Sequence, residues 1–167
     1  MLLHLLAAAM LILSGAFCGA YYSEKLKNRV RICTDAERLL RICAAMIRSS
    51  RRDIFNIIKA LKSEGLSELG FLFELPEEYS ADCDVRNCWR NALIRDRSIP
   101  AEEKAVLTEL GLILGTTDAE GQLSGIASLL VRMEELREQR REEYLRKGKL
   151  YRSLGVMAGV SVGIILI

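Results

Sequence analysis

Apolar residues follow two different patterns along the sequence. Between the two ends of the chain they recur at intervals of three and four, the period of a helix with one buried face, as in Val85, Cys88, Trp89, Ala92 and Leu93. At both ends they form runs with almost no polar interruption. No segment shows the alternation that is typical of a strand. The pattern predicts an all-α protein in which a helical bundle, residues 23–149, is flanked by two apolar helices.

Helix boundaries within the bundle are predicted from capping residues and polar breaks. Thr34-Asp35-Ala36-Glu37 has the spacing of a capping box and begins a helix, unless that helix continues unbroken from the N-terminal segment. A new apolar stripe follows the polar residues 48–52, and a short apolar piece covers residues 66–75. Asp82 or Asp84 is predicted to cap the helix that carries Trp89 on its core side.

The segment from Gly111 to Gln122 is predicted to be structural before it is functional. Gly115 is placed to end one helix, with a positive φ, and Thr117 is placed to cap the next. Asp118 follows in the first turn, where a carboxylate favours the helix dipole. The preceding helix is predicted to open at Ser98-Ile99-Pro100, because proline is tolerated in a first turn.

Residues 2–22 are predicted to form a transmembrane helix. Residues 2–20 contain no Asp, Glu, Lys or Arg, and His4 is their only ionisable side chain. A helix over residues 2–22 is about 31 Å long, which fits a hydrocarbon core of about 30 Å. A cleaved signal peptide is the alternative, but no basic residue precedes the run and no clear Ala-x-Ala site follows it.

Residues 150–167 are predicted to form a second transmembrane helix, because no charge occurs from Ser153 onward. Glycines recur every four residues in each predicted span: Gly15 and Gly19 in the first, and Gly155, Gly159 and Gly163 in the second. Faces without side chains favour close helix packing in lipid. The sequence leaves open whether these two faces pack on each other or on a membrane partner.

Basic residues flank both predicted spans on the side of the bundle. They are Lys25, Lys27, Arg29 and Arg31 after the first span, and Arg146, Lys147, Lys149 and Arg152 around the start of the second. The positive-inside rule then predicts a cytoplasmic bundle with both termini across the cell membrane.

Composition excludes several classes of function. A net charge of +2, with acidic and basic residues interspersed, does not indicate nucleic-acid binding. The five cysteines have no Cys-x-x-Cys spacing and no histidine in the bundle to complete a zinc site, so reduced thiols and no bound metal are expected. Glycine-rich phosphate loops are absent, and the carboxylates are distributed as surface charges. We therefore expect no enzyme activity, no cofactor and no small-molecule substrate.

The chain resembles the stage III sporulation protein AB family of endospore-forming bacteria. The resemblance depends first on Tyr151-Arg152-Ser153-Leu154-Gly155 leading into the terminal apolar run. It also depends on residues 110–118, Leu-Gly-Leu-Ile-Leu-Gly-Thr-Thr-Asp, with Gln122 shortly after, and on the Arg- and Glu-rich helix before the second span. The sequence departs from the family pattern at residues 48–52, and residues 77–83 do not align with it.

The resemblance implies a role in the channel between mother cell and forespore. It implies a helical domain similar to the cytoplasmic domains of the type II secretion platform protein F. The expected partners are the stage III sporulation protein AA ATPase, other stage III membrane proteins and membrane lipid, in the mother-cell membrane around the forespore. Two alternatives remain open: a membrane scaffold of another secretion- or pilus-like machine, and a secreted or tethered helical protein with a cleaved N-terminal signal.

Overall fold

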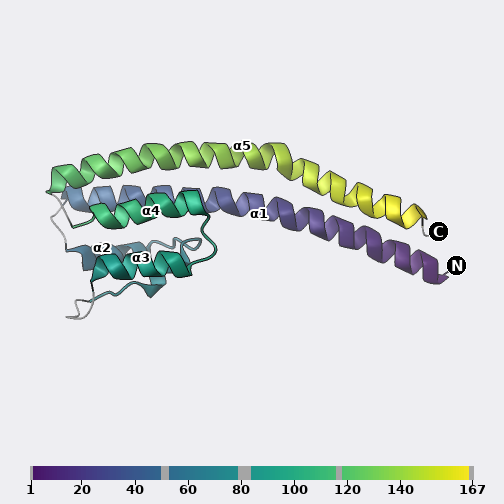
Figure 1. Cartoon of the computed structure of the whole chain (residues 1–167), viewed down its shortest axis with the longest axis horizontal. Helices are drawn as coiled ribbons and strands as arrows, with labels where there is room; N and C mark the ends of the chain where they lie inside the picture. Colours follow the sequence, from purple (N-terminus) through teal and green to yellow (C-terminus); the bar gives the residue numbers. More distant parts are fainter. Residues whose placement is uncertain (1, 50–52, 79–83, 116–117, 166–167) are drawn as a thin grey trace. The chain divides into compact units, whose positions relative to one another are not determined.

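The computed structural model describes residues 2–49, 53–78, 84–115 and 118–165. For residues 2–9, 11, 12, 152, 156, 158–160 and 162–165 it describes the helical backbone without the side chains. Six helical elements follow one another: α1 (Leu2–Ser49), α2 (Ile54–Ser63), the 3₁₀ helix η1 (Gly70–Glu74), α3 (Val85–Arg95), α4 (Ala101–Ile113) and α5 (Ala119–Ile165) (Figure 1). The described residues contain no strand, so the all-α prediction is confirmed.

The chain divides into two compact units. The two-helix unit combines Met1–Val30 with Glu138–Ile167, and the bundle unit is Arg31–Arg137. The long helices α1 and α5 therefore contribute one part to each unit. Residues 23–30 and 138–149, which the sequence pattern grouped with the bundle, belong to the two-helix unit.

The bundle unit is organised around one apolar core. Its largest fully buried side chains are Trp89, Phe71, Ile32, Leu39, Leu40, Ile58, Leu61, Leu66, Leu69, Leu72, Leu93 and Leu107. The Trp89 indole N–H donates to the carbonyl of Leu107 at 2.8 Å, and its ring meets Phe71 edge-on at a centroid distance of 5.1 Å. Trp89 thus joins α3, α4 and η1, and its predicted position on the core side of its helix is confirmed.

The predicted capping box at Thr34 is wrong, because α1 continues through this position without a break. Its alternative, a helix continuous with the N-terminal segment, is what the structure has. Glu37 does not cap a helix end. Its carboxylate is 2% exposed and pairs with Arg41 and with Arg137, at 2.8 Å from the latter. The two arginines hold this buried charge between α1 and α5.

Other helix ends follow local chemistry. Asp84 caps α3, since its side chain accepts the backbone N–H of Arg86 at 3.0 Å. Asp82 lies outside the described residues. The helix predicted to open at residues 98–100 begins at Ala101, so Pro100 immediately precedes the first turn of α4 and does not lie in it. The short apolar piece at residues 66–75 is not an α-helix; it becomes a turn followed by η1.

In the two-helix unit, α1 and α5 run antiparallel and bring the two ends of the chain together (Figure 1). Tyr22 and Tyr151 meet with ring centroids 5.7 Å apart, and Arg29 pairs with Glu143 at 3.8 Å. Within the described residues no helix is both long and apolar enough to cross a membrane. The structure therefore gives the two predicted transmembrane helices no support.

Candidate functional site

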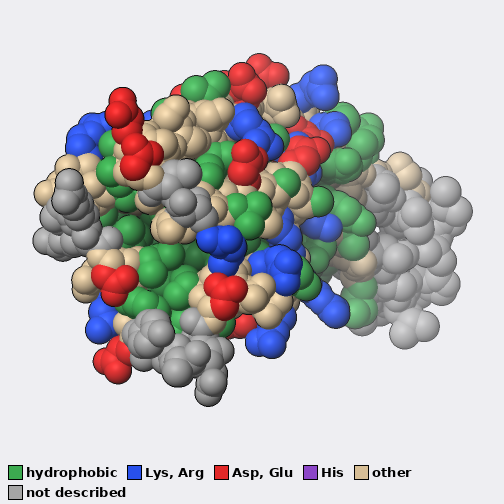
Figure 2. All heavy atoms as spheres, turned by 60° about the vertical axis from the view of Figure 1, so that its left-hand side comes forward, with side chains coloured by type: hydrophobic (Ala, Val, Ile, Leu, Met, Phe, Trp, Pro, Cys, Tyr) green, Lys and Arg blue, Asp and Glu red, His purple; other side chains and the backbone are tan. Residues whose placement is uncertain are grey.

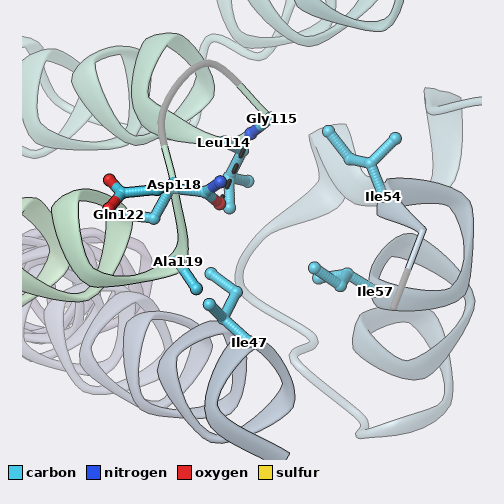
Figure 3. Close-up of a pocket in the computed structure, with 8 residues that line it drawn as sticks. All are labelled: Ile47, Ile54, Ile57, Leu114, Gly115, Asp118, Ala119 and Gln122. Carbon is cyan, nitrogen blue, oxygen red and sulfur yellow. Dashed lines mark hydrogen bonds between the residues drawn. The ribbon is translucent and has the colours of Figure 1, made fainter. Parts of the chain in front are cut away.

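A pocket of about 410 Å³ opens in the bundle unit where three segments converge (Figure 3). Its lining consists of Ile47, Ile54, Ile57, Leu114, Gly115, Asp118, Ala119 and Gln122. The isoleucines come from the end of α1 and from α2, and face the turn that joins α4 to α5. Three of the residues singled out in the predicted 111–122 segment, Gly115, Asp118 and Gln122, therefore line this pocket.

The turn that forms this side depends on a glycine and an aspartate. Gly115 has φ +77°, a conformation that favours glycine, and its N–H points to Gln122 Oε1 at 3.4 Å. Asp118 Oδ1 accepts the N–H of Gly121 at 3.1 Å, which is the contact of a helix cap. Asp118 therefore makes a capping contact at the start of α5. Thr117 itself lies outside the described residues.

The chemistry of the pocket is that of a binding surface. Five of its side chains are aliphatic, and Asp118 is the single ionisable group in the lining that the structure describes. The Asp118 carboxylate is already engaged in the helix cap. Among the described residues no cluster of His, Cys, Asp and Glu could hold a metal ion. The pocket therefore suits a ligand or partner side chain that is apolar and carries a polar or charged group next to its apolar part.

Two cysteines of the bundle unit, Cys33 and Cys43, lie in its core. Cys43 is fully buried, and this burial raises the pKa of its thiol to about 12, so it stays protonated. Cys33 is also buried and its thiol donates to Glu103 Oε1 at 3.6 Å. The Cys43 thiol therefore lacks the thiolate character of a nucleophile.

Of the glycines predicted to form packing faces, Gly155 of α5 lies against Gly15 and Gly19 of α1. A Cβ atom on Gly155 would collide with the carbonyl oxygen of Gly15 and would lie 3.1 Å from the Cα of Gly19. The two backbones approach this closely because all three residues lack side chains. Gly159 and Gly163 lie in α5, but their surroundings are outside the described part of the chain.

Comparison with protein families supplies the identity of the chain. The family model of stage III sporulation protein AB matches residues 4–167, nearly the whole sequence. The chain belongs to the stage III sporulation protein AB family. The resemblance drawn from residues 110–118 and 151–155 is thereby confirmed, and the protein acts in stage III of sporulation. The stage III sporulation protein AB family is a family of sporulation proteins and not a known family of enzymes. No curated protein and no solved structure matches the chain.

In this member of the stage III sporulation protein AB family, the Leu-Gly pair of the 110–118 motif has a packing role. Gly111 lies inside α4, and not in the turn with Gly115. A Cβ atom on Gly111 would lie 2.8 Å from both Cγ and Nε1 of Trp89. The glycine therefore lets the indole ring lie directly against the α4 backbone.

Sequence reasoning missed the two buried carboxylates, Glu37 and Glu103. Both are almost inaccessible to solvent, although the glutamates of this chain were interpreted as surface charges. Glu37 carried a signal that could have found it, since Arg41 follows at i+4. Glu103 occupies the core side of α4 next to Val106 and Leu107, where the apolar period alone predicts a hydrophobic side chain.

Proposed function

We propose that this protein is a non-enzymatic membrane scaffold of the channel between mother cell and forespore. In this proposal the two-helix unit anchors the chain in the mother-cell membrane around the forespore, through one span at each end. The bundle unit lies in the cytoplasm and docks the stage III sporulation protein AA ATPase to the membrane components. The family supports the sporulation role. The following contacts and exposures support the scaffold.

The observation that carries the proposal is the outer surface of the two-helix unit. Large apolar side chains lie exposed on both helices: Met10 (72%), Leu13 (69%), Phe17 (79%), Leu154 (50%) and Met157 (64%). A soluble monomer rarely exposes so many apolar side chains on one small unit, because each costs free energy in contact with water. Residues 2–20 also carry no Asp, Glu, Lys or Arg. Lipid is the surrounding that suits this composition.

The packing inside the two-helix unit suits the same surrounding. Helices in lipid associate through small residues that allow close backbone approach, and Gly155 lies directly against Gly15 and Gly19. Ser23, one turn beyond Gly19, is 1% exposed, and its hydroxyl lies 3.3 Å from where a Cβ atom on Gly148 would be. A small-residue seam therefore runs between the two helices.

The surface of the bundle unit carries mixed charged and apolar side chains, which suits contact with water and with protein partners. Figure 2 shows one face of the molecule on which acidic and basic side chains alternate around exposed apolar areas. Ion pairs on the bundle unit join distant segments: Arg38 of α1 pairs with Glu64, directly after α2, at 3.0 Å, and Arg41 of α1 pairs with Glu134 of α5 at 3.0 Å. The basic residues at the bases of both predicted spans favour the cytoplasmic side for this unit.

Thiol labelling tests the membrane placement. Val131 is 55% exposed on the bundle unit, so Val131→Cys presents a reactive thiol without disturbing the core. We expect a membrane-impermeant maleimide to label this variant, above the level of the parent protein, in permeabilised sporulating protoplasts but not in intact ones. Labelling of intact protoplasts would overturn the cytoplasmic placement, and extraction of the protein by alkaline carbonate would overturn the membrane anchor.

Docking of the ATPase is tested separately. The full chain, purified from membranes and reconstituted in phosphatidylcholine nanodiscs, should bind the purified stage III sporulation protein AA ATPase. Empty nanodiscs are the control. Absence of binding by the reconstituted chain would refute the docking role, whatever the outcome of the labelling experiment.

A further inference from the structure

The outward face of α3 is basic. Arg86 and Arg90 lie one helical turn apart on it, and Arg97 follows just beyond its end; all three side chains are exposed. Among the described residues no carboxylate lies within 4.0 Å of these three guanidinium groups, whereas Arg95 pairs with Glu74 at 3.6 Å. The face therefore carries positive charge that the described part of the molecule does not neutralise.

A small hollow of about 50 Å³ lies next to this charge, between α3 and α4. It is lined by Arg86, Asn87, Trp89, Arg90, Thr108, Gly111 and Leu112. Leu112 is 53% exposed, so an exposed apolar side chain and two arginines line the same depression. Because Gly111 has no side chain, the indole of Trp89 contributes to the lining.

The polar groups of the hollow are held in place from within α3. Asp84 accepts from the Asn87 amide at 2.8 Å, and the Asn87 carbonyl oxygen accepts from Arg90 at 3.2 Å. This chain of contacts fixes the Arg90 guanidinium beside the hollow while leaving its other N–H groups for a ligand. A pre-positioned guanidinium loses less conformational entropy on binding than a free side chain does.

We propose that this surface, formed by Arg86, Arg90 and Leu112, binds an acidic segment of a protein partner. Guanidinium groups pair with carboxylates through two parallel hydrogen bonds, and arginine is enriched in protein interfaces. Two arginines at i and i+4 match two carboxylates three or four residues apart on a partner helix. An apolar side chain on the same segment covers Leu112 and enters the hollow.

The geometry favours a protein over a lipid surface. A bilayer surface is broad and takes up protruding apolar side chains, of which α3 offers Ile94, 64% exposed. The hollow is a recessed feature that a protein side chain can fill, and the exposed Asn87 and Arg90 side chains line it. The inference rests on the proposed function, because it identifies the bundle surface on which the scaffold takes the ATPase.

The test measures binding of the purified stage III sporulation protein AA ATPase to the full chain in phosphatidylcholine nanodiscs. Arg90→Glu should weaken the affinity by roughly 10- to 100-fold, because it replaces an attraction by a repulsion at a desolvated contact. The matched control is Lys59→Glu, a charge reversal at an exposed position of α2. Leu112→Ser should also weaken binding, whereas Val131→Ser, at a residue of nearly equal exposure on α5, should not.

The outcomes separate the inference from the proposed function. Failure of the unaltered chain to bind the ATPase refutes the docking role and the inference with it. Binding by the unaltered chain that Arg90→Glu and Leu112→Ser leave intact refutes the inference alone. If Arg90→Glu leaves ATPase binding intact but abolishes capture by phosphatidylglycerol-containing vesicles, the surface binds lipid and the inference is wrong. Thermal unfolding of each variant must match that of the unaltered chain.

Discussion

Substitution of Gly111 by alanine is the most direct test of how α3 packs on α4. The new methyl group would lie 2.8 Å from Cγ and from Nε1 of Trp89, where ordinary contacts begin at 3.4 Å. Trp89 cannot retreat easily, because it is 2% exposed and its N–H is bonded to the Leu107 carbonyl at 2.8 Å. The strain therefore falls on the α3–α4 contact itself.

The expected magnitude follows from two opposing effects. Overpacking of a filled core costs about 1–3 kcal/mol, and we take about 3 because the collision involves three ring atoms. Alanine in a helix interior recovers about 1 kcal/mol relative to glycine. The free energy of unfolding should therefore fall by about 2 kcal/mol, which for a chain of this size lowers Tm by about 4–8 °C.

Thermal unfolding followed by circular dichroism measures this effect, with Gly125→Ala as the matched control. Gly125 is also inside a helix, but its new methyl group would meet the terminal methyl of Ile113 at 2.9 Å, at the end of a flexible side chain. We expect Gly125→Ala to be neutral or to stabilise by up to about 1 kcal/mol. Combined with Trp89→Leu, Gly111→Ala should cost less than it does alone, because the colliding ring is gone. A Tm of Gly111→Ala equal to that of Gly125→Ala would refute the packing argument.

Three further predictions concern charged groups. Glu37→Gln should lower the free energy of unfolding by about 2 kcal/mol, because it weakens a buried carboxylate contact with Arg137, and chemical denaturation measures it. Asp118→Ala should cost about 1 kcal/mol through the lost cap, and Asp118→Asn, which also caps, much less; equal losses in a thermal scan would contradict the capping role. The hydrogen bond from Lys147 lowers the pKa of Glu143, so the stability it provides is present above the ordinary pKa and is lost as the pH falls through the lowered value. Lys147→Met should therefore make Tm fall less steeply below about pH 4.5, and an unchanged pH profile would contradict this.

The helices of the bundle were predictable because the apolar spacing and the breaking residues that define a helix lie within the helix's own sequence. The i, i+3, i+4 pattern around Trp89 places that side chain in the core whatever α3 packs against, and Gly115 ends α4 because of its own backbone freedom. The positions of caps were less certain. Thr117 and Asp118 are adjacent and both are good capping residues, so sequence alone cannot decide which one a helix uses.

Contacts between distant segments could not be predicted from the sequence. Glu37 has the local signature of a capping box. Only its contact with Arg137, one hundred positions later, shows that it lies inside α1 and pairs with α5. The pocket likewise needs Ile47 and Ile57 to meet Gly115, and no periodicity specifies that meeting. The surface at Arg90 and Leu112 also appears only once α3 is placed beside α4.

The pairing of Gly155 with Gly15 and Gly19 imposes an order on biosynthesis. Residues 1–30 leave the ribosome before the part of α5 that belongs to the same unit, which begins at Glu138 after the whole of the bundle unit. At translation rates of about 5–20 residues per second, the first segment waits roughly 5–20 s for the second. During that interval its apolar surface and its glycine face have no intramolecular partner. The N-terminal segment can therefore complete its pairing with α5 only after the whole of Arg31–Arg137 has been synthesised.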